Sequence, residues 1–486
     1  MTPLILSCGV SSESHLLGEL ESSLTIQRFR DLSPKDVFGA ASRICKMLIG
    51  AGATPYFVGG CVRDAVLGNE FTDFDIEIFS IPFDGVERAL GGEFAVEKTG
   101  KAFCVLKLRD FPIDVSVPRS EVKLGDKHTN FHVNVIGKCD VKTAASRRDF
   151  TINSLYFDVK NEKLVDEFGG IGDLRSRILR HVGEKFSEDQ LRVLRGMQFA
   201  GRFCLRADEE TIEMCKNLSI DGLSKERIFS EWEKLILQGT APSFGLRFIR
   251  ECGWLKFFPQ IYAMDACMQD PKAHPEGSVF DHTCMCLDVF AKTRTGNRSE
   301  DRIIGFAALC HDMGKPLVTT RDDRGIHHYG HAEAGVVPAS EFLRSINAPN
   351  DLISAVIPLV LFHMSTRSLV GGGDLDSGVL HLANSVGRMD RLLRLCRIDL
   401  FGRGGQAKYD WDIETLLTDT AQRLGVLSDK PVPIIRGRHL EQFGLSPSEK
   451  FSKVLGICFS AQLDRKFTDF ESGMAYLQRI LESESL

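Results

Sequence analysis

The chain lacks several features that mark specialised classes of protein. No stretch approaches 18 uninterrupted apolar residues, and the first ten residues lack the basic segment that precedes the apolar part of a signal peptide. The 14 cysteines include no CxxC pair, which indicates reduced thiols rather than a disulfide scaffold. With 60 Lys and Arg against 66 Asp and Glu, the net charge is −6, so no global positive field attracts nucleic acid. We therefore expect a cytoplasmic protein without a membrane partner, in which any nucleic acid binds to local patches.

The chain is long enough for several folded domains. Its 486 residues exceed what one hydrophobic core usually serves, and 43% hydrophobic with 26% charged residues is a globular composition. From Asp36 to about Asp158, alternating runs such as FDIEIF and PIDVSV lie between helical patterns and predict a small sheet with helices. Beyond Leu174, apolar residues recur at spacings of three and four. The predicted fold class is therefore α+β, a small mixed sheet followed by mostly α-helical parts.

A glycine turn and two carboxylates form the first candidate site. The segment YFVGGCVRD places Gly59 and Gly60 between a predicted strand and a helix, where backbone N–H groups can hold a phosphate. In TDFDIEIF, Asp73 and Asp75 project from the same face of a strand, and Glu77 shares that face. Two such carboxylates repel each other, and oxygen ligands in this arrangement suit Mg²⁺. An edge strand with a charged outer face is the alternative interpretation.

A third carboxylate strengthens this site. Asp114 lies between apolar neighbours in PIDVSV, a position from which it would complete a two-metal site, although a capping or edge aspartate has the same pattern. The glycine turn, the DxD pair and Asp114 together resemble nucleotidyltransferases of the polymerase-β type. In that chemistry a 3′ hydroxyl attacks the α-phosphate of a nucleoside triphosphate and pyrophosphate leaves. The resemblance implies that Asp73, Asp75 and Asp114 are catalytic and that Asp73 and Asp75 bind Mg²⁺.

Further motifs extend the resemblance to one family. SRRDFTINSLYFD is followed by LVDEFGGIGDLRSRILRHVG and FSEDQLRVLRGMQFAGRF. This order is similar to that of class II tRNA nucleotidyltransferases, the CCA-adding enzymes and bacterial poly(A) polymerases, over about residues 36 to 470. The resemblance implies template-independent addition of CCA to tRNA 3′ ends, with ATP and CTP as substrates and a polymerase-β-like head.

The same resemblance implies roles for individual residues. In the resembling enzymes the matching positions contact the triphosphate, the ribose and the base, here Gly59, Gly60, Arg63, Arg148, Asp149, Asp189, Arg192 and Arg195. In PRSE, Arg119 and Glu121 match the Arg-x-Glu of a flexible loop that CCA-adding members need for the final A. Members that add only CC tend to lack this loop, so its presence favours full CCA addition.

The segment EDQLRVLR suggests how the base is selected. On a helix, Asp189, Arg192 and Arg195 follow at steps of three and would lie along one face. Aspartate accepts a hydrogen bond and arginine donates one, which suits the amino donor and ring acceptor of cytosine and adenine but not the reverse order in uracil and guanine. A salt-bridged helix face is the alternative. Between residues 174 and 206, eight Lys and Arg against three acids form a patch that can hold RNA phosphates.

Histidines gather in the second half of the chain. Seven of the thirteen lie between residues 274 and 363, and mixed His and Asp sets ligate Mn, Fe, Ni, Co or Zn and activate water to attack phosphate. The expected metal ligands are His282, His311, Asp312 and Asp399, with His331 and His363 as further candidates. The order H…HD…D resembles the HD phosphohydrolase superfamily, which implies an appended HD domain acting as a metal-dependent phosphohydrolase or mainly as an RNA-binding body. His274, His327 and His328 have the simpler interpretation of satisfied core residues.

The resemblance divides the chain into five parts. These are an unmatched extension at 1–35, the catalytic head at 36–158, a helical neck that binds RNA and nucleotide at 159–265, the HD domain at 266–405, and a helical tail at 406–486. Three alternatives stay open: a poly(A) polymerase or partial CC- or A-adding enzyme, a phosphohydrolase acting mainly through the HD domain, and an RNA-binding module without turnover. The intact carboxylate and RRD/EDxxR motifs speak against the last. The sequence indicates no oligomeric state.

Overall fold

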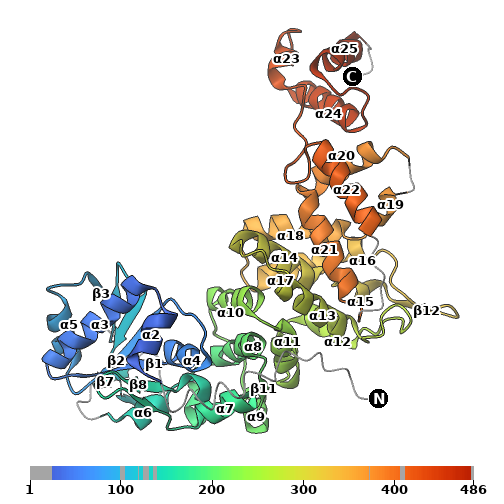
Figure 1. Ribbon diagram of the computed structural model, residues 1–486. Helices are drawn as coiled ribbons and strands as arrows, with labels where there is room; N and C mark the ends of the chain where they lie inside the picture. Colours follow the sequence, from blue (N-terminus) through green and yellow to red (C-terminus); the bar gives the residue numbers. More distant parts are fainter. Residues whose placement is uncertain are drawn as a thin grey trace. The chain divides into compact units, whose positions relative to one another are not determined.

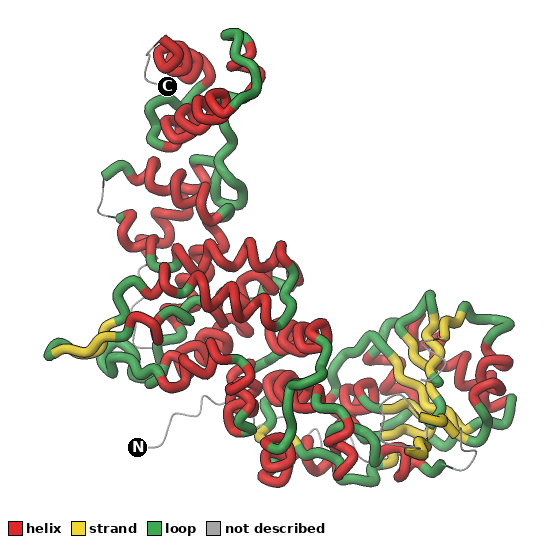
Figure 2. Tube along the Cα trace, turned by 180° about the vertical axis from the view of Figure 1, so that it is seen from behind, coloured by secondary structure: helices red, strands yellow, loops and turns green. Residues whose placement is uncertain are grey.

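The structure consists of two compact units with different secondary structure. This computed structural model describes residues 24–98, 104–118, 120–123, 131–134, 139–370, 373–404 and 411–482. The units are Met1–Asp221, which contains a seven-stranded sheet, and Gly222–Leu486, which is mostly helical (Figures 1 and 2). The predicted α+β fold is thereby confirmed. Within the described ranges, no helix is long and apolar enough to cross a membrane.

A mixed sheet organises the first unit. Its strand order is β3-β4-β5-β2-β1-β8-β9; β2 pairs with β5 in parallel, and the other neighbours pair antiparallel. The strands are β1 (Thr54–Val58), β2 (Phe74–Phe79), β3 (Val96–Lys98), β4 (Val105–Leu108), β5 (Ile113–Ser116), β8 (Tyr156–Asp158) and β9 (Lys163–Val165). A separate pair joins β6 (Ser120–Lys123) to β7 (Phe131–Asn134).

Helices accompany and follow this sheet. They are α2 (Ile26–Leu32), α3 (Lys35–Gly50), α4 (Gly60–Leu67), α5 (Phe83–Leu90), α6 (Val141–Ala145), α7 (Gly170–Ser176), α8 (Leu191–Phe203) and α9 (Glu209–Lys216), with 3-10 turns at Thr151–Asn153 and Glu184–Glu188 and a parallel pair of β10 (Ile178–Leu179) and β11 (Arg206–Ala207). α3 shows why such segments are helical, since Val37, Ala41, Ile44 and Leu48 recur at spacings of three and four and are all buried.

The two faces of the sheet differ because side chains alternate along each strand. One face carries Phe57 and Phe74, whose ring centroids lie 4.8 Å apart and which pack with Phe29 of α2. Asp75 and Glu77 alternate with buried apolar residues of β2 and therefore lie on the other face. The aromatic core thus holds the strands from one side and leaves the opposite face for polar groups.

The second unit is built from helices. They are α10 (Lys225–Gln238), α11 (Pro242–Glu251), α12 (Pro259–Ala266), α13 (Val279–Lys292), α14 (Arg298–Cys310), α15 (Lys315–Val318), α16 (His331–Ala334), α17 (Val336–Ser345), α18 (Asn350–Phe362), α19 (Ser365–Leu369), α20 (Leu375–Val386), α21 (Met389–Phe401), α22 (Trp411–Arg423), α23 (Gly437–Glu441), α24 (Glu449–Leu463) and α25 (Phe470–Glu482), with a hairpin of β12 (Thr320–Asp322) and β13 (Gly325–His327). Helices α14 and α21 pack against each other and against both α13 and α18, and together these four enclose a buried polar cluster.

Candidate active site and metal centre

A glycine turn joins β1 to α4 at the polar face of the sheet. Gly59 has φ 70° and ψ −124°, a conformation that L side chains rarely adopt. A Cβ at Gly59 would lie 3.2 Å from Arg148 Nη1 and 3.7 Å from Asp75 Oδ2. The turn therefore needs glycine for its backbone conformation and for the close approach of these two side chains.

The three predicted carboxylates lie at one region of the sheet. Asp73 is exposed just before β2, and Asp75 is half-buried within β2. Asp114 of β5 is the register partner of Asp75, so both project from the same face, and Lys107 Nζ lies 3.4 Å from Asp114 Oδ2. Burial raises the pKa of Asp75; Arg148 lowers it, and the Asp73 and Asp114 carboxylates raise it further. Mutual repulsion of this kind is what a divalent cation relieves.

This donor set fits Mg²⁺ in an open site. Mg²⁺ is commonly held by one or two carboxylates, with waters and substrate phosphate oxygens completing its coordination. Among the described residues, the tight groups of three or more metal-ligating atoms lie in the second unit, and Asp73, Asp75 and Asp114 do not form one. The head site therefore suits a cation that arrives with phosphates.

Glu77 anchors an arginine beside the glycine turn. Its carboxylate is buried, accepts a hydrogen bond from the Tyr156 hydroxyl, and lies 3.4 Å from Arg148 Nη2. Burial alone would lower the pKa of Arg148, but Tyr156, Glu77 and Asp75 raise it above the usual arginine value. The Arg148 guanidinium is thus held as a fixed positive charge against Gly59.

Asp149 links the head to helix α8. Its carboxylate is 6% exposed and accepts hydrogen bonds from Phe150 N at 2.8 Å, Asn153 Nδ2 at 3.0 Å and Arg195 Nε at 2.7 Å. Burial raises the pKa of Asp149, but Arg195 and the other donors outweigh this and lower it. Asp149 is therefore an ionised buried residue that orients Arg195.

Arg63 is also buried, at 3% exposure. Its guanidinium donates to Asp64 at 2.8 Å and to Asn153, and it lies 4.5 Å from the centroid of the Phe203 ring. These contacts connect α4 to α8. A Cβ at Gly60 would lie 3.7 Å from Arg63 Nη2, so the buried Arg63 guanidinium also lies beside the glycine turn.

The base-reading segment differs from its prediction at one residue. Helix α8 begins at Leu191, and Arg192 and Arg195 lie on it one turn apart, but Asp189 is extended, with φ −136° and ψ 104°. The Asp189 carboxylate accepts a hydrogen bond from Leu191 N at 3.1 Å, so it satisfies a backbone N–H at the start of α8 from outside the helix. The prediction that Asp189 lies on the helix was wrong.

Arg192 is fixed by backbone carbonyls. It donates from Nη1 to Lys185 O and from Nη2 to Arg147 O, both at 2.6 Å, and burial lowers its pKa. Of the predicted flexible-loop residues, Arg119 lies outside the described residues. Glu121 is in β6, of which only the backbone is described.

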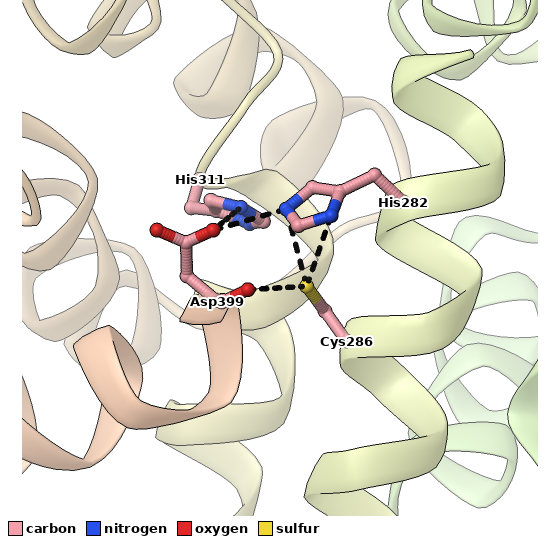
Figure 3. A group of neighbouring side chains, drawn as sticks. All are labelled: His282, Cys286, His311 and Asp399. Atoms are coloured by element: carbon pink, nitrogen blue, oxygen red, sulfur yellow. Dashed lines mark hydrogen bonds and ion pairs between the residues drawn. The ribbon is translucent and has the colours of Figure 1, made fainter. Parts of the chain in front are cut away.

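The predicted histidine site is assembled from helix ends in the second unit. His282 is on α13, His311 and Asp312 directly follow α14, and Asp399 is on α21. All four are at most 7% exposed. His282 Nε2 lies 3.0 Å from Asp399 Oδ1 (Figure 3). It lies 3.6 Å from Asp312 Oδ2, and His311 Nε2 lies 3.2 Å from the same oxygen. The residues predicted as metal ligands therefore meet.

His331 and His363 join the same centre. Their Nε2 atoms lie 3.1 Å apart, and each is within 4 Å of Asp312 Oδ1, at 3.5 and 3.9 Å. Burial lowers the pKa of His363 to about 4. Gly314 permits this approach, because a Cβ there would lie 2.0 Å from the carbonyl oxygen of His331.

The imidazoles are oriented as metal ligands are. His311, His331 and His363 each donate from Nδ1 to the carbonyl oxygen three residues earlier, at 2.7 to 2.8 Å. This bond leaves Nε2 as the ring nitrogen that faces the centre, and each of the three Nε2 atoms lies within 4 Å of an Asp312 carboxylate oxygen. His311 Nε2 is buried and has no hydrogen-bond partner among the described residues. Converging imidazole nitrogens and carboxylates with an orphaned nitrogen fit a divalent transition metal.

Several surrounding residues were missed by the sequence analysis. Glu276 lies 2.9 Å from His282 Nδ1, Lys315 Nζ lies 2.7 Å from Asp312 Oδ2, and Arg403 Nη2 lies 2.9 Å from Asp399 Oδ2. Lys315 and Arg403 follow their aspartates by three and four residues, a helical spacing that the sequence does contain. Glu276 lies in a loop and carries no such signal.

Comparisons with known proteins agree with this geometry. The model of the poly(A) polymerase head domain matches residues 55–180. The Multifunctional CCA protein of Pasteurella multocida is 34% identical over 304 residues, covering 61% of this chain and 70% of that protein. That of Xylella fastidiosa is 31% identical over 369 residues, covering 72% of this chain and 84% of that protein. The chain belongs to the multifunctional CCA protein family.

Solved structures extend the similarity of this chain to its fold. The CCA-adding enzyme of Bacillus stearothermophilus in complex with CTP superposes with a TM-score of 0.62 at 18% identity, covering 91% of this chain and 97% of that one. The CCA-adding enzyme of Thermotoga maritima complexed with tRNA gives 0.57 at 18% identity, covering 95% and 99%. These structures show the fold, and the family model together with the relatives confirms the predicted family of class II CCA-adding enzymes and poly(A) polymerases.

Proposed function

We propose that this chain is a template-independent tRNA nucleotidyltransferase that adds CCA to tRNA 3′ ends from CTP and ATP. One observation carries the proposal: Asp75 and Asp114 lie in register on one face of the sheet, beside a glycine turn where an added Cβ would come within 4 Å of both Asp75 and Arg148. Family membership supports the same activity.

In this proposal the chain's own residues bind and orient the substrates. Asp73 and Asp75 would hold Mg²⁺, with Asp114 as a weaker third ligand, and the metal supplies activation of the attacking hydroxyl and stabilisation of the leaving oxygen. The Gly59 N–H already donates to Leu155 O at 3.1 Å, so phosphate is bound by the N–H groups at the start of α4, beginning with Gly60, and Arg148 adds a fixed positive charge. Bound phosphate is thereby oriented towards the carboxylates.

In this proposal, residues at the start of α8 select CTP and ATP over the other nucleotides. Arg192 is held by backbone carbonyls and Arg195 by Asp149, so both guanidinium groups have fixed orientations. Asp189, just before the helix, provides the acceptor of the pair. Such rigid donors and acceptors discriminate between base edges better than mobile ones do. Poly(A) polymerase and partial CC- or A-adding activity are alternatives within the same family.

The decisive experiment supplies nucleotides separately. Purified protein with Mg²⁺ and tRNA transcripts ending before CCA receives CTP alone, ATP alone, or both. Two Cs followed by a single A support CCA addition, long A tails without a C requirement indicate poly(A) polymerase, and addition of C or A alone indicates a partial enzyme. Asp75→Asn should abolish incorporation, whereas Asp110→Asn, an exposed carboxylate in the β4–β5 turn, should not.

We further propose that residues 266–405 form an HD domain that hydrolyses phosphoesters with a divalent transition metal. The convergence of four imidazoles on Asp312 and Asp399 supports this second activity. With Ni²⁺, Co²⁺ or Mn²⁺, His311→Ala should lose hydrolysis of cyclic nucleotides and of simple phosphomonoesters while retaining incorporation of CMP. Hydrolysis that survives in His311→Ala would refute this second proposal. The other domain boundaries, 1–35, 36–158, 159–265 and 406–486, are part of the same proposal.

A further inference from the structure

A cysteine lies inside the buried histidine centre. Cys286 follows His282 by one helical turn on α13, so both side chains emerge from the same side of the helix. Cys286 Sγ lies 3.4 Å from His282 Nε2, and the ligating atoms of His282, Cys286, His311 and Asp399 all lie within 4.8 Å of one another (Figure 3). The thiol is 0% exposed.

Gly402 leaves room for the Cys286 thiol beside helix α21. Gly402 follows α21 with φ −68°, an ordinary conformation that any residue adopts, so the glycine is not needed for its backbone angles. A Cβ at Gly402 would lie 2.3 Å from Cys286 Sγ and 3.1 Å from Cys286 N. The absence of a side chain at Gly402 therefore lets α13 and α21 close around the sulfur.

The distances suit four ligands around one ion. A tetrahedral ion with bonds of about 2.0–2.3 Å to nitrogen, oxygen and sulfur places its ligand atoms roughly 3.3–3.8 Å apart. Here His282 Nε2 lies 3.0 Å from Asp399 Oδ1 and 3.4 Å from Cys286 Sγ, and His311 Nε2 lies 3.9 Å from Asp399 Oδ1. These distances lie on both sides of the tetrahedral range, and small movements of the side chains would bring the ligand atoms into it.

We propose that Cys286 is a ligand of this centre, giving a His₂AspCys site that takes a thiophilic transition metal such as Zn²⁺ or Co²⁺ in preference to Mn²⁺ or Mg²⁺. The inference rests on the proposed metal site of the second unit and takes the sulfur of Cys286, in place of Asp312, as the fourth ligand beside His282, His311 and Asp399. Thiolate is a soft donor that favours these metals, whereas a site made of imidazole and carboxylate alone accepts harder ones. On ligation the Cys286 thiol gives its proton to water, and a sulfur–metal bond forms.

Cobalt binding tests the sulfur directly. The full-length protein, stripped of metal by a chelator, is titrated with Co²⁺ and its near-ultraviolet absorption is recorded, since sulfur-to-cobalt charge transfer absorbs there and imidazole or carboxylate ligation does not. The test variant is Cys286→Ser. The matched control is Cys284→Ser, which is also 0% exposed and on the same helix but outside the cluster. Circular dichroism confirms that each variant is folded.

The proposal predicts the charge-transfer band in the wild type and in Cys284→Ser and its loss in Cys286→Ser. The ratio of Zn²⁺ to Mn²⁺ affinity should fall by about 10- to 100-fold in Cys286→Ser, the range seen when a site loses one supporting interaction. If Cys286→Ser is unfolded, Gly402→Ala serves instead, because its methyl group displaces the sulfur, and the band should weaken.

Other outcomes separate this inference from the activity on which it rests. Cobalt binding with the visible bands of imidazole ligation but without a sulfur band in the wild type would overturn the cysteine ligand and leave the metal site standing. An unchanged band and unchanged affinity ratio in Cys286→Ser would do the same. No cobalt binding in the wild type would overturn both.

Discussion

Replacing Gly59 with alanine tests the central feature of the head site. The residue has φ 70° and ψ −124°, and holding an L residue there costs about 1–3 kcal/mol. The new methyl carbon would lie 3.2 Å from Arg148 Nη1, so Arg148 must move by a few tenths of an ångström away from the turn. We therefore expect Gly59→Ala to lower the free energy of unfolding by about 2 kcal/mol.

Activity should fall further than stability explains. The methyl group would also lie 3.7 Å from Asp75 Oδ2, at the place where phosphate and carboxylate must approach each other. A misplacement of about 1 Å can reduce the rate by about 100-fold, and we expect a loss of about tenfold for the smaller shift here. The assay is single-turnover incorporation of CMP into tRNA lacking CCA, at a temperature where urea titration shows that the variant is folded.

A matched control separates the site from a general glycine effect. Gly39 is exposed within helix α3, and a Cβ there would meet no atom within 4 Å. Gly39→Ala should leave incorporation unchanged and stabilise the protein by about 0.5–1 kcal/mol. Wild-type incorporation and unchanged unfolding in Gly59→Ala would refute the assignment of this turn to the active site.

Three further changes test other parts of the structure. Asp189→Ala should reduce discrimination between CTP and UTP by about tenfold or more, since a base-reading hydrogen bond is lost, and unchanged selectivity among the four triphosphates would reject the base-reading role. Asp301→Asn removes a buried carboxylate that accepts from Arg394 Nη2 at 2.8 Å and should cost about 3 kcal/mol at pH 7. Burial raises the pKa of Asp301, but backbone N–H groups and Arg394 lower it overall. The stabilisation by Asp301 is therefore present above the ordinary pKa of about 4 and is lost as the pH falls through the folded pKa. In urea titrations from pH 7 to pH 3, the difference in free energy of unfolding between wild type and Asp301→Asn should shrink, and a constant difference would contradict this. Lys315→Met removes the ammonium 2.7 Å from Asp312 Oδ2 and should lower metal-dependent hydrolysis at least tenfold without altering CMP incorporation; equal loss of both activities would indicate a structural role.

Local patterns predicted which carboxylates of the head share a face of the sheet. Alternation along β2 and β5 places Asp75 and Asp114 on one face, and this follows from strand geometry once the strands are recognised. The pattern failed at Asp189, where a three-residue step was taken to mean a continuing helix. Its carboxylate binds a nearby backbone N–H instead, and such competition between side chain and helix depends on backbone geometry that spacing alone does not contain.

Roles that depend on partners far apart in the sequence could not be predicted from local patterns. The sequence predicted the face of the sheet on which Glu77 lies. It did not predict the contacts of Glu77, because Arg148 and Tyr156 are 71 and 79 residues away in the chain. The burial of Arg63 likewise depends on the packing of α8 against α4, through Phe199 and Phe203.

The sequence by itself determined the residue types, the strand and helix patterns, and the family resemblance, because these reside in short motifs and in periodicity. Tertiary structure decided which side chains share a site. His282 and Asp399 meet across 117 residues, and Cys286 reaches them because Gly402 leaves room beside α13. No local pattern encodes these meetings, since they arise from the packing of helices whose apolar faces have no partner until the whole unit folds.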